Sequence, residues 1–470
     1  MRTTYYDLIQ QSYYFPQRNF GLRNGYLTFH NVPLRHLIEK YGTPLRIFYL
    51  PHIGSQITKA QNYFRRAFRK YHYKGNYYYC YCTKSNHFFP VLKEVLNYNT
   101  HLETSSAYDI DLILRLYEKK LIDKQRFIIH NGTKPLEYLE KIMHLYDLGF
   151  ENSIIVLDSV NELERLKKVM GKRTIKIGLR AAIHQESQFP FYTSRLGIPT
   201  DLIIQFYKEK IADNKQLELK MFHFFVESGI RDVIYYWEQL QIAINLYVEL
   251  RKLCPTIDSF NIGGGFPIQN SLDFEYDYEY MINEIVVNIK DACEKEDIPE
   301  PHIFSEFGRY TVGESGALIF EVFEQKQQND TEIWYIINNS LMTTMPDIWS
   351  LKERFIVLPI NKWYNSYARV NIGGITCDRS DYYTQETLSQ EVILPKFSLL
   401  DTEPLFVGFF HNGAYQDEIS GFGGIKHCLI PSPRHIIIDN DDDGNLLEYE
   451  LNNYQTADDM LRLLGYDDNF

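Results

Sequence analysis

Short apolar segments alternate with amphipathic segments between residues 77 and 308. The apolar runs have the length and composition of buried strands, and they cover residues 77–84, 100–104, 126–132, 153–158, 174–181, 219–225, 259–265 and 302–308. The segments between them place apolar residues three and four apart, as helices do: residues 89–98, 107–119, 135–148, 160–170 and 235–253. Alternating strands and helices predict parallel pairing with right-handed crossovers. Eight such units over roughly 240 residues predict an α/β fold, a closed (β/α)8 TIM barrel. An open doubly wound sheet is the alternative, but no dinucleotide-binding glycine pattern follows the first strand.

The pattern changes after residue 312, where strand-like runs are separated by turn residues. They cover residues 318–325, 332–337, 367–372, 391–394, 405–410 and 435–438, and they predict a mostly antiparallel β domain. Near the N-terminus, residues 26–31 and 45–50 also have β and turn character. We therefore expect three parts: an N-terminal segment (1–50) packing with the β domain, the barrel (51–312) and the C-terminal β domain (313–470).

Composition narrows the classes of protein. The chain has 470 residues, of which 44% are hydrophobic, enough for a globular protein with more than one domain. A net charge of −12, with no basic stripe, argues against nucleic-acid binding. Neither a secretory signal nor a membrane-spanning run of about 18 apolar residues is apparent. The six cysteines lack the paired spacing of a zinc site, so we expect no metal and a reduced, cytoplasmic location.

Polar residues end the predicted barrel strands, where barrel enzymes place their active sites. They are Lys84, Glu103, Asn131, Asp158, Arg180, His223 with Ser228, the triplet Gly263, Gly264 and Gly265, and Glu306 with Gly308 and Arg309. An isolated lysine at a strand end is more often simply solvated, but one with a lowered pKa is a ready amine for a Schiff base.

The last two strand ends point to a phosphate and a ring nitrogen. Three consecutive glycines let backbone N–H groups approach an anion closely, although alone they are more often a tight turn. Arg309 offers a bidentate phosphate contact. With Lys84 for an aldehyde and Glu306 for a ring nitrogen, these are the groups that pyridoxal 5′-phosphate requires.

These residues and several further blocks resemble the alanine racemase–ornithine decarboxylase class of pyridoxal-phosphate enzymes, which join a barrel to a β domain. The resemblance runs from about residue 77 to residue 430 and is strongest to biosynthetic arginine decarboxylases. It is carried by residues 128–132 (IIHNG), 291–294 (DACE), 305–309 (SEFGR), 345–349 (MPDIW), 376–378 (TCD), 408–410 (GFF) and 413–416 (GAYQ).

The resemblance implies a role for each matching residue. Lys84 takes the place of the Schiff-base lysine, and Glu306 that of the acid that keeps the pyridine nitrogen protonated. Arg180 matches a residue near the cofactor. Glu103, judged by its position alone, is a candidate to support the cofactor, with an indirect role as the simpler prediction. The implied phosphate binders are Gly263, Gly264, Gly265, Ser228, Gly308, Arg309 and Tyr415.

In the β domain the resemblance implies contacts with the substrate. Cys377 matches the residue that protonates the substrate carbon, reaching in from the other subunit of a head-to-tail homodimer with shared active sites. Asp378 matches the acid that receives the distal cationic group of a small amino-acid substrate. Asp347 is a second candidate for that contact, and a turn or cap role is the alternative.

The chain departs from the family pattern after the sixth predicted strand. The family has a histidine that stacks on the cofactor ring, and Phe225 stands here instead. An aromatic face still stacks, but the hydrogen bonds of an imidazole are lost. Glu227 replaces a glycine and adds a carboxylate near the expected phosphate region.

The resemblance implies decarboxylation of a basic L-amino acid, most simply L-arginine to agmatine and CO₂ in polyamine (putrescine and spermidine) biosynthesis. Ornithine or diaminopimelate decarboxylation is the alternative on the same scaffold, although diaminopimelate enzymes typically have glutamate at the place of Asp378. A non-catalytic pyridoxal-phosphate carrier is the alternative from another class, but such carriers lack the β domain. A racemase would have a tyrosine where Cys377 stands.

Residues 439–450 fit the pattern of an EF-hand calcium loop, with eight of these positions acidic or amide residues. The flanking residues 435–438 and 446–451 have strand character instead of the helices that an EF-hand requires. An Asp-Gly hairpin turn is therefore the simpler prediction.

Overall fold

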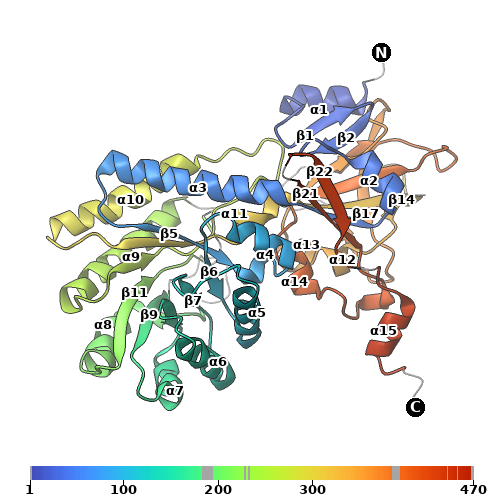
Figure 1. The fold of residues 1–470 in the computed structure, drawn as a ribbon. Coiled ribbons are helices and arrows are strands. Elements are labelled where there is room, and N and C mark those ends of the chain that lie inside the picture. The colour runs from blue at the N-terminus through green and yellow to red at the C-terminus, as the bar shows by residue number, and fades with distance from the viewer. Residues whose placement is uncertain are drawn as a thin grey trace. The chain divides into compact units, whose positions relative to one another are not determined.

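The computed structural model describes residues 3–182, 194–226, 229–230, 233–383, 392–441, 443–452 and 454–466. The chain forms two compact units (Figure 1). The barrel unit comprises Gly54–Pro267 and Tyr276–Thr311, and the β unit comprises Met1–Ile53, Ile268–Glu275 and Val312–Phe470.

Eight parallel strands close into a ring in the barrel unit. In ring order they are β5 (Tyr77–Cys82), β6 (His101–Thr104), β7 (Ile128–His130), β8 (Ser153–Leu157), β9 (Ile175–Ala182), β11 (Leu217–His223), β12 (Ser259–Asn261) and β13 (His302–Glu306). Pairing of β13 with β5 completes the closure. The ring confirms the TIM-type barrel predicted from the alternating pattern and excludes an open sheet. A short β10 (Ile198–Pro199) pairs with β9.

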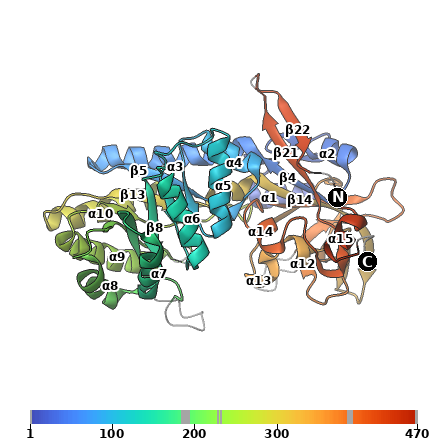
Figure 2. The ribbon, with the colours of Figure 1, turned by 60° about the horizontal axis from the view of Figure 1, so that its bottom comes forward.

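Helices cover the outside of the barrel. Their bounds are α3 (Leu50–Tyr71), α4 (Phe89–Leu96), α5 (Ala107–Glu118), α6 (Leu136–Asp147), α7 (Val160–Met170), α8 (Thr200–Phe206), α9 (Val233–Leu253) and α10 (Tyr278–Lys295). Neighbouring helices α5, α6 and α7 pack side by side (Figure 2). At the start of α5, Ser106 and Asp109 form a capping box that satisfies the first free N–H groups. Helices α3, α8 and α10 are absent from the sequence prediction.

The barrel interior is packed with apolar side chains, so its chemistry is confined to the strand ends. The buried cluster consists of Cys80, Ile129, Ile154, Val156, Met221 and Phe304. Six of the eight predicted strands are shorter in the structure. Lys84 lies beyond β5, the glycine triplet beyond β12, and Gly308 beyond β13.

The β unit is built around the long strand β14 (Gly316–Gln327). It pairs antiparallel with β4 (Leu45–Tyr49), β15 (Ile333–Ile337) and β20 (Leu405–Phe410). The sheet continues through β16 (Ile356–Pro359), β17 (Tyr367–Gly373), β18 (Tyr382–Tyr383), β19 (Val392–Pro395), β21 (Arg434–Asn440) and β22 (Leu446–Glu450). Only β15–β17 and β4–β21 are parallel among its described pairs, so the domain is mostly antiparallel, as predicted.

The N-terminal segment shares a core with the β unit. Strand β4 lies between β14 and β21, while β1 (Phe20–Arg23), β2 (Tyr26–Phe29) and β3 (Val32–Pro33) form a small sheet. The segment also contains α1 (Tyr5–Tyr13) and α2 (Leu34–Tyr41), where sequence patterning suggests β and turn. Thr4 and Asp7 form a capping box that starts α1, a local signal that apolar periodicity does not register.

Residues 268–275 belong to the β unit, although the sequence pattern places them in the barrel. Their backbone is bonded to residues of the β unit. The amide of Gln269 donates to Glu314 Oε1 (3.1 Å), and its carbonyl accepts from His411 Nδ1 (2.6 Å). Gln17 donates to the carbonyl of Leu272 (2.8 Å). The sequence pattern does not predict that this segment leaves the barrel unit, because the segment has no strand or helix periodicity of its own.

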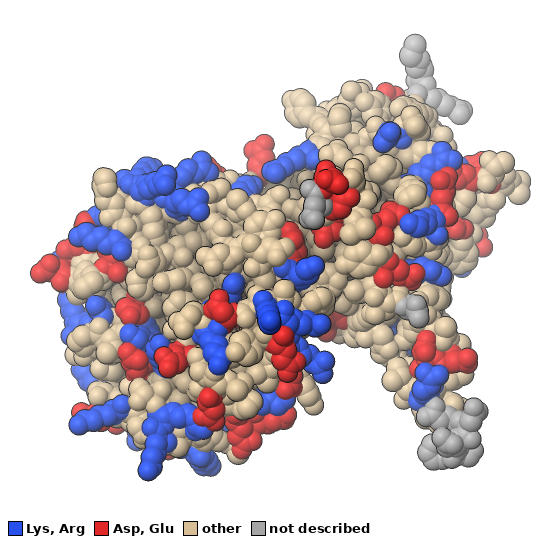
Figure 3. Space-filling model, viewed as in Figure 1, with Lys and Arg blue, Asp and Glu red and all other residues tan. Residues whose placement is uncertain are grey.

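Short helices complete the fold. They are α11 (Arg309–Val312), which leads out of the barrel, and, in the β unit, α12 (Leu341–Thr344), α13 (Asp347–Ser350), α14 (Gln416–Ser420) and α15 (Ala457–Leu463). No helix among the described residues is long and apolar enough to cross a membrane. On the face shown in Figure 3, acidic and basic side chains are interspersed over both units.

The segment that fits the EF-hand pattern forms a β-hairpin. Strands β21 and β22 pair antiparallel and project from the β unit (Figure 2). The Asp441 carboxylate accepts hydrogen bonds from the amides of Asp443 (3.0 Å) and Asn445 (2.7 Å) at the turn. The predicted hairpin is therefore confirmed, and the flanking helices of an EF-hand are not formed.

Candidate active site

Three polar side chains from the carboxyl ends of barrel strands converge on the carboxylate of Glu306, the last residue of β13. Its Oε1 accepts from the amides of Asn131 (2.9 Å) and Asn261 (2.7 Å). Its Oε2 accepts from Nε2 of His223 (3.1 Å). Asn131 follows β7, which is not adjacent to β13 in the ring, so this bond crosses the mouth of the barrel.

These contacts keep Glu306 ionised. Burial by itself raises the pKa of a carboxyl group, but the charge and hydrogen bond of His223, the charge of Lys84 and the Asn131 bond outweigh it. The resulting pKa of Glu306 is about 2. A carboxylate offers about four acceptor positions, of which these three donors use three. One position remains for a further cationic N–H group.

Lys84 lies beside this carboxylate, in the single 3₁₀ turn Thr83–Ser85 that follows β5. Its Nζ donates to Oε1 of Glu103 at 2.9 Å. Glu103 is fully buried on β6, whereas the Lys84 side chain remains 42% exposed. The lysine is therefore held in place by one ion pair and stays accessible to a ligand from solvent.

A second lysine near the strand ends shows the contrasting arrangement. Lys134 is completely buried, and its Nζ donates to Glu162 (2.7 Å) and to the carbonyls of Gly132 (2.8 Å) and Val156 (2.6 Å). All three donor positions of its ammonium group are occupied. Lys134 therefore stabilises the barrel, and Lys84 is the lysine available for chemistry.

The glycine triplet occupies a loop that leaves no room for side chains. A Cβ at Gly263 would lie 2.7 Å from Cδ2 of Phe225, and one at Gly264 would lie 2.3 Å from the carbonyl oxygen of Glu306. Gly263 and Gly265 also have positive φ angles of 66° and 97°. The amides of Gly264 and Gly265 make no hydrogen bond to a described residue, as expected of a cradle for an anion.

The predicted stacking residue lies next to this loop. The ring of Phe225 is half-buried after β11, and the guanidinium carbon of Arg180 lies 5.7 Å from its centroid. Arg180 is buried at the end of β9, with its Nη1 3.9 Å from Asp158. The structure thus brings Phe225, Arg180 and the triplet to the same side of the barrel mouth.

The remaining predicted phosphate binders lie in different parts of the chain. Gly308 and Arg309 follow Glu306 directly, with Gly308 buried and Arg309 half-buried at the start of α11. Ser228 lies outside the described residues, as does Glu227. Tyr415, in the β unit, is half-buried in the left-handed region (φ 69°) where it caps α14.

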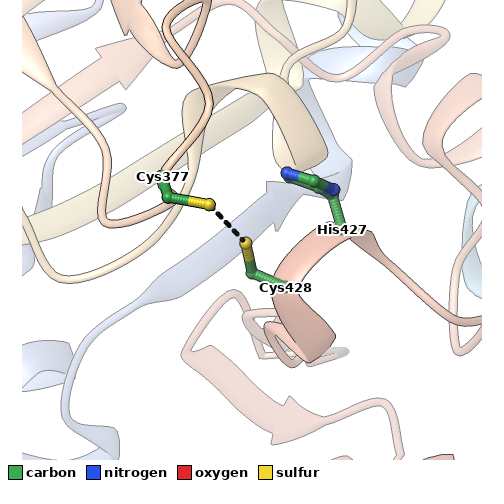
Figure 4. Close-up of side chains that lie close together, drawn as sticks. All are labelled: Cys377, His427 and Cys428. Carbon is green, nitrogen blue, oxygen red and sulfur yellow. Dashed lines mark hydrogen bonds between the residues drawn. The ribbon is translucent and has the colours of Figure 1, made fainter.

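In the β unit, Cys377 lies in the loop that follows β17. The loop is exposed at Cys377, whose Sγ lies 3.8 Å from Sγ of Cys428 (Figure 4). His427 is close to both thiols. Cys377 and Cys428 lie 51 positions apart in the sequence, so spacing rules for metal ligands, which predict no site here, cannot detect the grouping.

Asp378 is half-buried beside Cys377. Its Oδ1 accepts from the amide of Ser380 at 2.7 Å. This backbone bond is the largest cause of a lowered pKa of Asp378, and the charges of His427 and Arg379 contribute further. The side chain is therefore anionic in neutral solution, as a contact for a cationic group requires.

Asp347 is fully buried at the first position of α13. Its Oδ2 accepts from Nε2 of Gln416 (2.8 Å), the residue after Tyr415. The amides of Leu351 and Glu353 donate to its backbone carbonyl (3.1 and 3.0 Å). The two backbone bonds belong to the turn of α13, and no side chain among the described residues caps the N-terminus of that helix. A cap role and a substrate contact for Asp347 both stay predictions.

Sequence reasoning missed Asn261 and gave no role to Asn131 and His223. Asn261 is the last residue of the short strand β12, hidden in a run predicted to continue to Gly265. The order of the strands could have predicted these contacts. Strands β11, β12 and β13 are neighbours in the barrel, so the residues at their ends, His223, Asn261 and Glu306, lie close together.

An α/β barrel with an accessible lysine, an ionised buried carboxylate and a glycine loop at its mouth defines a site for a pyridine cofactor. The family model for the pyridoxal binding domain of pyridoxal-dependent decarboxylases matches residues 54–313. The chain belongs to this family, and pyridoxal phosphate is its cofactor. This membership favours a decarboxylase over a non-catalytic carrier.

Individual relatives extend the similarity beyond the barrel. A biosynthetic arginine decarboxylase of Prochlorococcus marinus (strain AS9601) is 23% identical over 544 residues, covering 90% of this chain and 82% of the relative. The crystal structure of a biosynthetic arginine decarboxylase from Campylobacter jejuni has a TM-score of 0.79 at 22% identity, covering 98% of this chain and 90% of that one. A diaminopimelate decarboxylase from Helicobacter pylori, complexed with L-lysine, has a TM-score of 0.73 at 17% identity, covering 92% and 99%.

The barrel residues fit the cofactor by their own chemistry. Glu306 is fixed, ionised and has one acceptor position left for a ring N–H. Buried atoms beside it, Nδ1 of His223 and Oδ1 of Asn131, have no hydrogen-bond partner among the described residues. The glycine loop offers amides without room for side chains. These observations agree with a polar ligand seated at the barrel mouth.

Proposed function

We propose that this protein catalyses the decarboxylation of L-arginine to agmatine and CO₂, feeding polyamine synthesis. The observation that carries the chemistry is the Glu306 carboxylate, held ionised by Asn131, Asn261 and His223 beside Lys84. The choice of arginine is supported by similarity to biosynthetic arginine decarboxylases over 90% of the chain.

Each barrel residue contributes a distinct function. Lys84 offers the amine that holds the aldehyde of the cofactor, and Glu306 holds its ring nitrogen. Phe225 offers a face for stacking, Arg180 lies beside it, and the glycine triplet with Gly308 and Arg309 forms the phosphate site. Phosphate contacts of Ser228 and Tyr415 stay predictions from the family resemblance. When bound, pyridoxal phosphate supplies a protonated ring that accepts the electron pair released as the bond from Cα to the carboxylate breaks. Glu306 sustains that protonation because its pKa is about 2.

Two residues of the β unit act on the substrate in this proposal. The hydrogen bond and charge of the neighbouring Cys428 raise the pKa of Cys377. Its thiol therefore carries a proton at neutral pH, which it donates to the substrate carbon after CO₂ has left. Asp378 accepts the guanidinium group through paired, charge-assisted hydrogen bonds, and Asp347 is a second candidate for this contact.

We also propose a head-to-tail homodimer in which Cys377 and Asp378 of one subunit complete the site of the other. Exposed placement of Cys377 on a loop supports this arrangement. Lys84→Ala and Cys377→Ala variants, each lowered by about 10²-fold or more alone, should regain about one quarter of the wild-type rate when unfolded and refolded together, because half of the dimers then contain one intact site. No recovery in mixed dimers, verified by differently tagged subunits, would contradict shared sites. A cytoplasmic location stays a prediction.

A panel of substrates tests the reaction. CO₂ release from arginine, ornithine, lysine and diaminopimelate should be fastest from arginine at equal concentrations. Asp378→Ala should raise KM for arginine more than it lowers kcat, because it removes a contact to a distal group. Asp330→Ala, at an exposed position of the same unit, is the control. Equal rates on all four substrates would refute a specific contact at Asp378.

Diaminopimelate is the second candidate substrate, favoured by the structural likeness to the Helicobacter pylori enzyme. The two substrates differ at the distal end, where arginine carries a cation and diaminopimelate carries both an amine and a carboxylate. Asp378 stands where diaminopimelate enzymes typically have glutamate, so this position favours arginine. A preference for diaminopimelate in the panel would replace arginine in the proposal and leave the cofactor assignment intact.

A further inference from the structure

Cys377, His427 and Cys428 present three ligand atoms that all lie within 4.8 Å of one another (Figure 4). All three residues are exposed, so an ion from solvent can reach them. Two thiolates and an imidazole are the ligand set that borderline-soft divalent ions prefer.

The spacing of the sulfur atoms fits a tetrahedral ion. With a Zn–S distance of about 2.3 Å, two sulfur ligands of a tetrahedral zinc ion lie about 3.8 Å apart. The Sγ atoms of Cys377 and Cys428 are separated by 3.8 Å. A disulfide requires an S–S distance of about 2.05 Å, so the observed separation matches ion ligands better than an oxidised pair.

Both ligand-bearing segments are anchored to the same short helix, α12. In the first segment, Asp381 accepts from the amide of Met342 (3.0 Å) and from the amide and hydroxyl of Thr376 (3.1 and 2.7 Å). In the second, the buried Lys426 donates to the carbonyl of Thr343 at 3.2 Å. Residues that follow these anchors, Cys377 and His427, are thereby held in a fixed relation before any ligand arrives.

The backbone of the second segment is itself strained. Cys428 has φ 56° and ψ 18°, inside a 3₁₀ turn. Non-glycine residues rarely adopt this left-handed conformation, and it persists only where surrounding contacts impose it. Here it directs the Cys428 thiol toward Cys377 (Figure 4).

We propose that Cys377, His427 and Cys428 form a binding site for Zn²⁺ or a similar divalent ion, with one coordination position left open. Binding replaces the protons of both thiols, which leave to solvent, so no oxidant or reductant is involved. The inhibitory consequence depends on the proposed function: an ion on the Cys377 thiolate removes the proton that this residue donates, and zinc then inhibits decarboxylation reversibly.

Binding is measured on the full-length, cofactor-loaded protein after reduction and removal of metal. We expect one Zn²⁺ per chain in competition with a chromophoric chelator, and Co²⁺ should give a thiolate-to-cobalt charge-transfer band. Cys428→Ser and His427→Ala should each weaken binding by more than about 100-fold, since even losing an outer-shell partner costs 10–100-fold. His144→Ala, at an exposed histidine of the barrel unit, is the matched control and should bind as the wild type does.

Each of three results would overturn the proposed site. The cobalt band could be absent, or the zinc affinity of Cys428→Ser and His427→Ala could equal that of the wild type. The isolated protein could also contain a Cys377–Cys428 disulfide and bind no zinc after reduction. Zinc inhibition is compared with the metal-free rate of each variant and should disappear in Cys428→Ser. Because the binding assay needs no turnover, an inactive protein that binds zinc refutes the proposed function and keeps the site. An active protein that binds no zinc refutes the site alone.

Discussion

The barrel mouth and the Cys377 loop hold reactive groups in opposite ways. At the barrel mouth, the Glu306 carboxylate is buried and accepts from three buried donors, so its ionisation is fixed by Asn131, Asn261 and His223. Cys377 is exposed, and its segment is anchored by Asp381, which does not belong to the ligand set. The barrel therefore supplies a constant electrostatic setting, while the loop supplies a thiol that protons and metal ions can reach.

The largest expected effect is at Lys84. Lys84→Ala should abolish the absorption band of the bound cofactor and lower activity by more than about 10³-fold, because Lys134, a second lysine near the strand ends, is buried and fully paired. Lys93→Ala, at an exposed position of α4, is the control. Retention of the cofactor band in the Lys84 variant would contradict the assignment of the barrel mouth.

Removing the charge of Glu306 tests whether the barrel site is electrostatically fixed. Glu306→Gln should lower kcat by about 10²–10³-fold. The substitution should also lower the free energy of unfolding by about 1–3 kcal/mol. The NH₂ group of the new amide faces an N–H donor whose hydrogen bond the carboxylate accepted. Chemical denaturation and steady-state kinetics measure both, with exposed Glu164→Gln as control. Wild-type kinetics in the Glu306 variant would mean that ring protonation is controlled elsewhere.

Acid should weaken the barrel through the same carboxylate. The folded pKa of Glu306, about 2, lies below its ordinary value, so its contribution is present above about pH 4.3 and is lost as pH falls toward 2. The loss attributable to this group is up to about 3 kcal/mol. Urea unfolding at about pH 6 and about pH 3 should show a smaller pH dependence in Glu306→Gln than in the wild type. An identical dependence in both would contradict the ionised network.

Cys377→Ala tests the role of the loop as a source of protons. We expect kcat to fall by about 10²-fold, the lower end for loss of a general acid. Cofactor binding should remain unchanged, in contrast to Lys84→Ala. Cys377→Ser should restore part of the rate if a hydroxyl can deliver the proton. A normal rate in the alanine variant, measured with arginine and verified by product analysis, would exclude Cys377 as the donor.

The smallest effect is expected at the anchor of the loop. Asp381→Asn offers one acceptor oxygen in place of two, so it should lower the free energy of unfolding by about 1 kcal/mol. It should lower kcat by less than about tenfold, because Cys377 is displaced but present. Zinc affinity measured in parallel should also fall. Loss of cofactor binding in this variant would contradict the independence of the two sites.

Local and periodic features of the sequence were sufficient for the architecture. Alternating apolar strands and amphipathic helices indicate a parallel sheet whose strands are buried on both faces, and the number of such units, eight, then favours a closed barrel. The strand-end rule then placed Lys84, Glu306 and the glycine triplet at one end of the barrel. Helices α1 and α10 were not predicted. Their sequence signals, a capping pattern and faces that mix apolar with polar residues, are less distinctive than a run of apolar strand residues.

Contacts between distant segments were decided only by the tertiary structure. The partners of Glu306 come from β7, β11 and β12, and their number sets its pKa through burial and charge, which no linear spacing encodes. The 3.8 Å approach of Cys377 to Cys428 likewise depends on two loops that α12 holds in register. The sequence alone thus determined which reactive groups the chain carries and which end of the barrel they occupy. Folding decided which of them touch, because proximity across the chain depends on the closure of the sheet and on loop anchoring.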